Sequence, residues 1–549
     1  MPSRPASYAE EQESDVVHEL ERAQQRREAM EAKQMDVADE SDEEAMDDGE
    51  GSESEGEGDE KENASPNSQW EPLTHGFKVP SFSHSSGSHL PPHRVRSELG
   101  YVQCFIDDEL VATIAANTNL YAASKGAPAG WATNAAEIWR FISVHIFMGI
   151  VDLPQMHMYW EAEYRQQYAI DAFPRDRFNE LLRYFHIAKP TPTRVKHTAI
   201  DKIEPLHTRC LQTFRDYFLP GRELTVDETM VRFKGRSPWK TIIRGKPTPI
   251  GYKLYTLASH GYLLCFQVYK GKGGYATRQD VIHHTVIQLV EHWKERNHIL
   301  FTDNLYTSPA LCDHLERIGI RSCGTARSNR SGLPPGLKTT MKALQKGESK
   351  AWQKGHLGCL LWYDKQPVLF LSTHHRVDHM ITFEQNRGPN LPSTVTKPKI
   401  AIDYNLHKGH VDTVDQLRQY YAMQRKTYKN WHSLAWWLLD MCVVNAYTLW
   451  CLDTKADITQ LEFRRTLLHQ LRDAYPPSVH RAPPTAPPSF TPVNDGHWPR
   501  RSGKRRDCAH CSEGRYHRVR SEVQCKRCGV HLCIDPCFEQ YHSGQQRSE

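Results

Sequence analysis

The 549-residue chain has little that would place it in or across a membrane. Its amino terminus has no apolar core after the first basic residue, so no signal peptide is predicted. The most apolar run, Ala435 to Leu452, is interrupted by Asp440 and Asn445 and is short for a bilayer, so we expect a core helix there. With 39% hydrophobic and 25% charged residues, the composition is typical of a water-soluble protein with two or more folded units.

Apolar residues are nearly absent from Asp36 to Glu62, where Gly and Ser alternate with acidic residues. Such a segment cannot bury enough surface to offset the entropy of ordering it, and we expect it to be disordered. Residues 1–62 carry a net charge of −17, so with a total of +3 the rest of the chain carries +20. A body this basic is typical of a nucleic-acid-binding protein. The acidic arm is then either a competitor of DNA or a segment that binds a partner.

Cysteine is sparse over most of the chain and dense at its end. Eight of the 14 cysteines are scattered from Cys104 to Cys451, as expected for reduced thiols of an intracellular protein. The other six, with nearby histidines, form CxxC pairs of the spacing that binds tetrahedral zinc, and they predict two zinc ions in place of a disulfide framework. The predicted ligands are Cys508, Cys511, Cys525, Cys528, His531, Cys533, Cys537 and His542, with His510 and His517 as spare candidates. Spacing alone does not decide which ligands share an ion.

Aspartates end two apolar, β-prone runs: Asp227 in Leu-Thr-Val-Asp-Glu-Thr-Met and Asp303 in Ile-Leu-Phe-Thr-Asp-Asn. Asp412 and Asp415 are three residues apart, which on a helix places both on one face. Buried carboxylates are costly without a cation or hydrogen bonds, and carboxylates gathered from distant segments indicate a Mg²⁺ or Mn²⁺ site for phosphodiester chemistry. Strand alternation places Glu228 on the face opposite Asp227, so we expect Glu228 to be structural. The alternative for each aspartate is a turn or a helix cap.

The segments around these aspartates predict a mixed α/β fold. Three strands are followed by alternating helix and strand, which is the order of a ribonuclease-H-like domain, with Asp227 on the central strand. The predicted elements are a strand from Leu224 to Lys234, a hairpin of Tyr252 to Ser259 and Leu263 to Tyr269, a helix from Arg278 to Arg296, a strand from His298 to Thr302, a helix from Ser308 to Ile318, and a strand from Arg321 to Thr325.

At these residues the chain resembles the piggyBac family of DDE transposases. The resemblance covers roughly residues 95 to 545 and rests on Val-Asp-Glu-Thr-Met at 226–230, Phe-Lys-Gly-Arg at 233–236, Gly-Lys-Pro at 245–247, Thr-Asp-Asn-Leu-Tyr-Thr-Ser at 302–308, Val-Asp-Thr-Val-Asp-Gln at 411–416, and Arg-Lys-Thr at 425–427 followed by Trp431. It implies that Asp227, Asp303, Asp412 and Asp415 are catalytic and hold Mg²⁺ or Mn²⁺. It also implies a cross-brace zinc domain, with Cys508, Cys511, His531 and Cys533 on one ion and Cys525, Cys528, Cys537 and His542 on the other.

The resemblance further implies a domain order. We expect a disordered region and linker at 1–96, a helical dimerisation and DNA-binding domain at 97–222 and 422–498, a ribonuclease-H-like catalytic domain at 223–331 and 399–421, an inserted small β domain at 332–398, a basic linker at 499–507, and the zinc-binding domain at 508–542. The protein would then act as a homodimer.

Basic residues near the carboxylates predict contacts with DNA phosphates, and one aromatic residue is a candidate to stack on an unpaired base. These are Arg232, Lys234, Arg236, Arg244, Lys246, Lys253, Arg425, Lys426, Lys429 and Trp431. A separate basic cluster favours nuclear import and therefore a nuclear location: Arg500, Arg501, Lys504, Arg505 and Arg506.

The resulting hypothesis is a nuclear DNA transposase. By resemblance it would hydrolyse and transfer phosphodiesters of double-stranded DNA at transposon ends and TTAA targets, through a hairpin intermediate and without a small-molecule substrate. Two alternatives remain open: a domesticated, transposase-derived chromatin protein that binds DNA without transposition, and a zinc-finger ubiquitin ligase or interaction protein, since RING and PHD fingers use related ligands.

Overall fold

The computed structural model describes residues 70–73, 80–82, 84–91, 97–191, 198–271, 275, 277–384, 394–477, 497–512 and 519–545. The chain divides into two compact units, Met1–Pro477 and Ser478–Glu549. The acidic stretch Asp36–Glu62 and the spare candidate His517 lie outside the described residues.

Ten of the described strands form one mixed sheet in the first unit. Its centre contains β4 (Glu223–Arg232), β6 (Ile250–Ser259), β7 (Tyr262–Val268), β8 (Ile299–Thr302) and β9 (Arg321–Thr325). Strand β4 pairs antiparallel with β6 and parallel with β8, and β8 pairs parallel with β9. The predicted strands and the hairpin are confirmed, and β4, which carries Asp227, lies between β6 and β8.

Strands from the predicted insertion domain continue this sheet. Strands β10 (Ser349–Lys354), β11 (Leu357–Tyr363) and β12 (Pro367–Ser372) pair in turn, and β12 pairs with β9. The edges are β1 (Glu71–Pro72) beside β10 and β5 (Lys240–Ile242) beside β6. Helix α10 (Leu337–Ala343) and a separate hairpin, β13 (Met380–Glu384) with β14 (Thr394–Pro398), complete the region.

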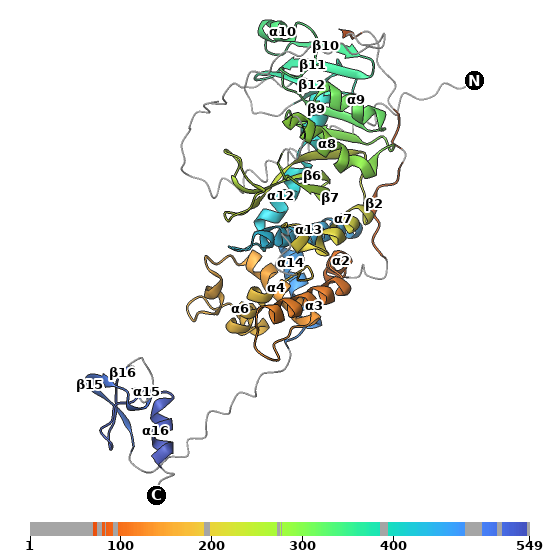
Figure 1. The fold of residues 1–549 in the computed structure, drawn as a ribbon. Coiled ribbons are helices and arrows are strands. Elements are labelled where there is room, and N and C mark those ends of the chain that lie inside the picture. The colour runs from red at the N-terminus through yellow and green to blue at the C-terminus, as the bar shows by residue number, and fades with distance from the viewer. Residues whose placement is uncertain are drawn as a thin grey trace. The chain divides into compact units, whose positions relative to one another are not determined.

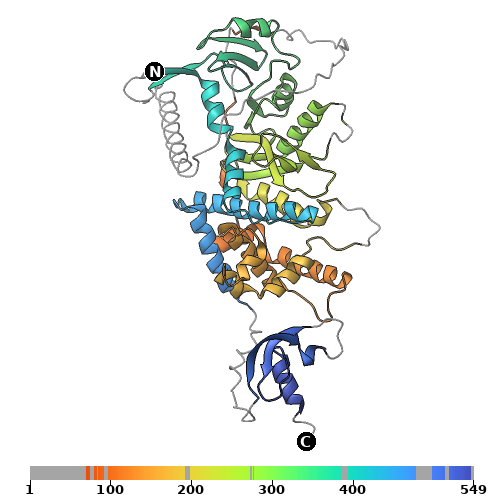
Figure 2. The same cartoon turned by 90° about the vertical axis from the view of Figure 1, so that its left-hand side faces the viewer.

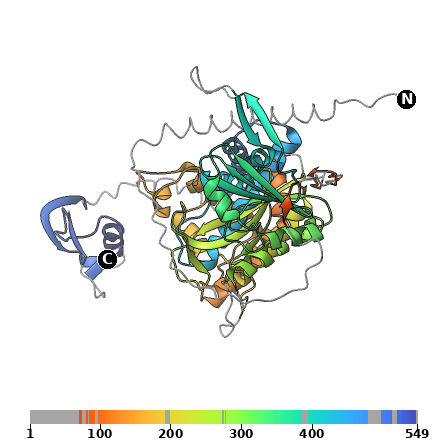
Figure 3. The same cartoon turned by 90° about the horizontal axis from the view of Figure 1, so that it is seen from above.

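Helices cover the sheet. Helix α8 (Arg278–Val290), with the short η3 (Glu291–Trp293), leads into β8, and α9 (Pro309–Arg317) joins β8 to β9. Right-handed crossovers place helices of this kind on one side of a parallel sheet, where Figure 3 shows the green α8 and α9. Ser308, where the predicted helix begins, is the N-cap of α9, since its hydroxyl accepts a hydrogen bond from Leu311 N. Helices α11 (Lys399–His407) and α12 (His410–Tyr420) also pack on β4.

The remaining helices of the first unit come from two stretches of sequence. The described elements are α2 (Glu98–Phe105), α3 (Asp108–Ser124), α4 (Ala135–Ile150), η1 (Met156–Trp160), α5 (Gln167–Ala172), α6 (Arg175–Tyr184), η2 (Asp201–Ile203), α7 (Leu206–Asp216), α13 (Asn430–Thr454) and α14 (Gln460–Ala474), with a two-stranded pair of β2 (Gly87–Ser88) and β3 (Phe218–Leu219). Helix α13 packs against both α2 and β7, and it lies between the helices and the sheet (Figures 1 and 2).

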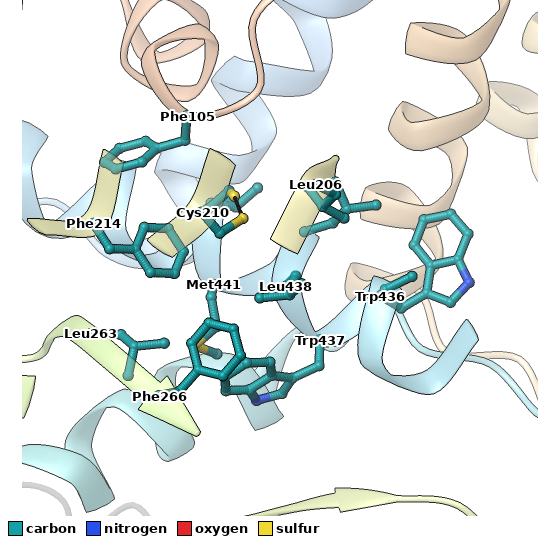
Figure 4. Packing of buried hydrophobic residues seen from close by; sticks show 14 of the residues in the cluster. Phe105, Leu206, Cys210, Phe214, Leu263, Phe266, Trp436, Trp437, Leu438 and Met441 are labelled. Carbon is teal, nitrogen blue, oxygen red and sulfur yellow. Dashed lines mark hydrogen bonds between the residues drawn. The ribbon is translucent and has the colours of Figure 1, made fainter. Parts of the chain in front are cut away.

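Helix α13 joins helices and sheet through one hydrophobic core. The rings of Trp437 on α13 and Phe266 on β7 lie 5.0 Å apart, and Figure 4 shows Met441 and Phe214 in the same cluster. In the described part of the chain, α13 is the one helix long and apolar enough to cross a membrane, but 78% of its apolar window is buried inside the protein. The structure therefore uses this segment as a core helix, as predicted.

A charged pair lies inside this helical region. Asp440 on α13 and Arg464 on α14 are both 0% exposed, and their closest nitrogen and oxygen are 3.7 Å apart. Both Asp440 carboxylate oxygens accept from Met423 N, whereas three guanidinium nitrogens of Arg464 have no hydrogen-bond partner. Arg464 therefore depends on Asp440 to compensate its charge.

We expect Asp440→Asn to lower the free energy of unfolding by about 3–5 kcal/mol, because it leaves a buried guanidinium without a counter-charge. Urea denaturation followed by circular dichroism measures the change. Asp473→Asn is the matched control, since that carboxylate is 76% exposed on the same pair of helices and its loss should change stability by less than about 0.5 kcal/mol. Equal stability of Asp440→Asn and the wild type would contradict the prediction.

The second unit is built around a short antiparallel pair, β15 (Pro499–Asp507) and β16 (Arg520–Cys525), with α15 (Ala509–Ser512) and α16 (Cys537–Gln545). The run predicted as a basic linker is thus strand β15. Arg500, Arg501, Lys504, Arg505 and Arg506 on it are exposed. All 14 cysteines of the chain are free, so the structure contains no disulfide framework.

Candidate functional site

Asp227 and Asp303 come from neighbouring parallel strands. Val226 on β4 is the register partner of Thr302 on β8, so the aspartate that follows each of them stands beside the other. Burial, then the negative charge of Glu228 and that of Asp303, raise the pKa of Asp227 to about 7. Burial also raises the pKa of Asp303. The two carboxylates therefore repel each other at a place where water does not screen them well.

Helix α12 packs on β4 and brings Asp415 to one face of that strand. Thr229 lies on the Asp227 face, and it is close enough to Asp415 to lower the pKa of that carboxyl. Burial raises the pKa of Asp415 to about 6, against the opposing effects of Arg418 and Thr229. Asp412 lies one turn earlier on α12 and is exposed.

The four aspartates do not form a closed cage of metal ligands. In the described part of the chain, groups of three or more ligand side chains with atoms within 4.8 Å of one another occur only in the second unit. The donor set nevertheless fits a hard divalent cation. Asp415 Oδ1 is buried without a hydrogen-bond partner, and the pKa of Asp227 stays raised despite the nearby positive charge of Lys246, so a bound cation would stabilise these carboxylates.

Strand alternation predicts that Glu228 faces away from Asp227, although its charge still raises the pKa of both Asp227 and Asp303. Its carboxylate forms a buried ion pair with Lys253, and Lys246 Nζ lies 3.8 Å from its second oxygen. Tyr306 was not singled out from the sequence. It is fully buried, its hydroxyl has no hydrogen-bond partner, and burial together with the charges of Glu228, Asp227 and Asp303 raises its pKa.

The predicted DNA contacts divide by exposure. Arg232, Lys234, Arg236, Arg244 and Lys426 are exposed, and Lys246 is half-buried. Two of the predicted DNA contacts, Lys253 and Trp431, do not fit the structure, because each is only 3% exposed. Lys253 pairs with Glu228, and Trp431 packs in the first turn of α13 against the Phe185 ring. Two further basic residues, Arg425 and Lys429, are engaged with backbone carbonyls.

The second unit holds two clusters with zinc-ligand chemistry. Cys508, Cys511, Cys533 and Cys537 form one, and His497, Cys525, Cys528 and His542 form the other. His542 Nδ1 lies 2.7 Å from Phe538 O, which leaves Nε2 facing Cys528 Sγ at 3.6 Å. A backbone partner on the second ring nitrogen is the usual way in which a ligating imidazole is oriented.

This grouping differs from the pairing expected from the resemblance. Cys537 joins the Cys508 cluster, and His531 belongs to neither cluster because its Nδ1 is 3.1 Å from Ser521 O in a bridge between residues 524 and 531. His497 takes the fourth position, with its Nδ1 3.1 Å from Cys528 Sγ. His497 was missed in the sequence because it lies before the basic run, outside the segment that contains the six clustered cysteines. Its position just before that run was the only sequence signal that could have identified it. The spare candidate His510 contacts Gln540.

Comparison with known proteins adds to this geometry. A DDE-type family model described as Transposase IS4 matches residues 97–447. Human piggyBac transposable element-derived protein 3 is 28% identical, and the match covers 82% of this chain and 77% of that protein. The chain belongs to the piggyBac family of DDE transposases.

Other members of the piggyBac family agree with this placement. Human piggyBac transposable element-derived protein 2 is 25% identical, with 81% of this chain and 76% of that protein covered. A solved structure of a piggyBac transposase synaptic complex with hairpin DNA matches with a TM-score of 0.62 and 21% identity, over 82% of this chain and 98% of that chain. The two chains therefore share a fold.

Proposed function

We propose that this protein is a DNA transposase of the piggyBac type, with a ribonuclease-H-like catalytic centre formed by Asp227, Asp303, Asp412 and Asp415. One observation supports this most directly. Asp227 and Asp303 directly follow the register partners Val226 and Thr302 of two parallel strands, while α12 places Asp415 near Thr229 of β4.

The chain's own groups define what this centre does. Asp227 and Asp303 supply carboxylate oxygens from the sheet, and Asp412 and Asp415 supply them from the helix. Bound Mg²⁺ or Mn²⁺ would activate the attacking oxygen and neutralise charge on the transferring phosphate. In the first step a water oxygen bonds to phosphorus, the bond to the 3′ oxygen breaks, and the freed DNA 3′-hydroxyl takes a proton. That 3′-hydroxyl then attacks a second phosphodiester and displaces another 3′ oxygen.

Charge and the comparisons support DNA as the partner. Arg232, Lys234 and Arg236 are exposed at and beyond the end of β4, where they can neutralise phosphates. The matched solved structure is a synaptic complex with hairpin DNA, which supports a homodimer on paired DNA ends for this chain as well. TTAA targets, end recognition by a two-zinc second unit and a nuclear location belong to the same proposal.

The test is a cleavage assay on DNA whose ends match this protein, identified as inverted repeats bounded by TTAA if such repeats flank the gene. We expect 3′-hydroxyl ends to form with Mg²⁺ or Mn²⁺ and none to form with EDTA. DNA that is bound tightly but left uncut with either metal would overturn the enzymatic proposal in favour of a domesticated binding protein. Ubiquitin transfer without DNA affinity would favour the ligase alternative.

A further inference from the structure

The segment Ala422–Lys429, which joins α12 to α13, has no helix or strand but a regular pattern of exposure. Lys426 and Tyr428 are exposed, whereas Arg425, Thr427 and Lys429 are partly buried. Lys426 and Tyr428 are thus the two exposed side chains of residues 425–429. Tyr428 is 89% exposed.

Three anchors hold this segment to the rest of the first unit. The Arg425 guanidinium donates to Met148 O in the last turn of α4. Lys429 Nζ donates to Arg183 O at 2.8 Å and to Leu182 O at 3.3 Å, in the last turn of α6. Gln424 Nε2 donates to Arg232 O, the last residue of β4, at 2.6 Å. The last carbonyls of a helix lack partners and favour cations, so Arg425 and Lys429 position Lys426 and Tyr428.

A cavity of about 220 Å³ opens beside the anchored segment. Its lining includes His145, His432, Arg425, Lys426, Tyr428 and Lys429. His145 and His432 are buried, and Nε2 of each has no hydrogen-bond partner. His145 Nδ1 lies 3.0 Å from Phe141 O, so Nδ1 carries the proton and Nε2 is a free acceptor. Burial lowers the pKa of both imidazoles, which keeps them neutral.

We propose that this cavity and its rim bind an unpaired nucleotide of DNA. The base stacks on the Tyr428 ring, and Lys426 meets the adjacent phosphate. Stacking on an aromatic ring tolerates any base, because every base has a π face. The inference rests on the proposed function, which makes DNA the substrate. It also moves the stacking role that the sequence assigned to the buried Trp431 onto Tyr428.

The test uses the full-length protein and two duplexes that differ at one position. 2-Aminopurine stands opposite thymine in one and opposite an abasic site in the other. We expect the wild type to quench the unpaired probe and to bind that duplex about tenfold more tightly than the paired one. Tyr428→Ala should remove this preference while leaving affinity for the paired duplex unchanged, and Tyr428→Phe should keep it. Lys426→Gln should weaken both complexes equally and lower the salt slope by about 1.

Tyr164→Ala is the matched control, because Tyr164 is 41% exposed elsewhere in the first unit and should keep the full preference. A Tyr428→Ala protein that still prefers the unpaired duplex, or a wild type that binds both duplexes equally, overturns the inference alone. A wild type that binds neither duplex overturns the proposed function, and the inference with it.

Discussion

Asp227→Asn is expected to reduce the rate of DNA cleavage by about a thousandfold or more while changing DNA affinity less than about twofold. The amide has the size of the carboxylate but is a poor ligand for a hard divalent cation. Loss of a metal-bound step removes several kcal/mol of transition-state stabilisation, and each 1.4 kcal/mol is a factor of about ten in rate. Single-turnover cleavage with Mg²⁺, beside a binding isotherm on the same DNA, separates the two effects.

Asp303→Asn and Asp412→Asn should behave in the same way, and Asp415→Asn should also be impaired. The matched control is Asp364→Asn, which alters an exposed aspartate between β11 and β12 and should cleave at the wild-type rate. Wild-type cleavage by Asp227→Asn would remove these aspartates from the catalytic role. Parallel loss of binding and cleavage would instead indicate a folding defect.

The second large effect concerns His497 in the second unit. The full-length protein should contain two equivalents of zinc, and His497→Asn should lower this to about one, because His497 closes the cluster of Cys525, Cys528 and His542. Structural zinc contributes about 10–16 kcal/mol to small domains of this kind, so loss of a site should also unfold the second unit. Elemental analysis gives the zinc content, and limited proteolysis between the two units reports the loss of structure.

The matched control for this change is His531→Asn. His531 is buried and hydrogen-bonds Ser521 O, so its replacement should keep both zinc equivalents. The opposite result, with zinc lost in His531→Asn and kept in His497→Asn, would restore the pairing expected from the sequence and contradict the structural grouping.

The elements around Asp227 and Asp303 could be predicted because local signals coincide there. Apolar β-prone runs end at Asp227 and Asp303, and Ser308 followed by Pro309 marks the start of α9. These signals depend only on residues that are close in sequence, so they do not require knowledge of tertiary contacts. The alternation of side chains along β4 is also a local signal, and it assigned a structural role to Glu228. Glu228 forms an ion pair with Lys253.

Features that depend on distant contacts were not predictable. Trp431 follows a basic stretch and was expected at the DNA surface, but the first turn of α13 packs it against Phe185 from another part of the chain. His497 is 28 residues before Cys525, and only the β15–β16 pairing brings it to the cysteines. The sequence after residue 348 predicts strands but not their partners, so the pairing of β12 with β9, which extends the main sheet, could not be predicted.

The adjacency of Asp227 and Glu228 on β4 makes this strand intolerant of changes in length. Insertion or deletion of one residue between Glu223 and Val226 would reverse the facing of every later side chain in the strand, because side chains alternate with a period of two. Glu228 would then turn toward α12, and Asp227 would turn toward Lys253. The sequence would still contain Asp227 and Glu228 side by side. Such a one-residue change could therefore keep the acidic motif in the sequence while it destroys the arrangement of the carboxylates.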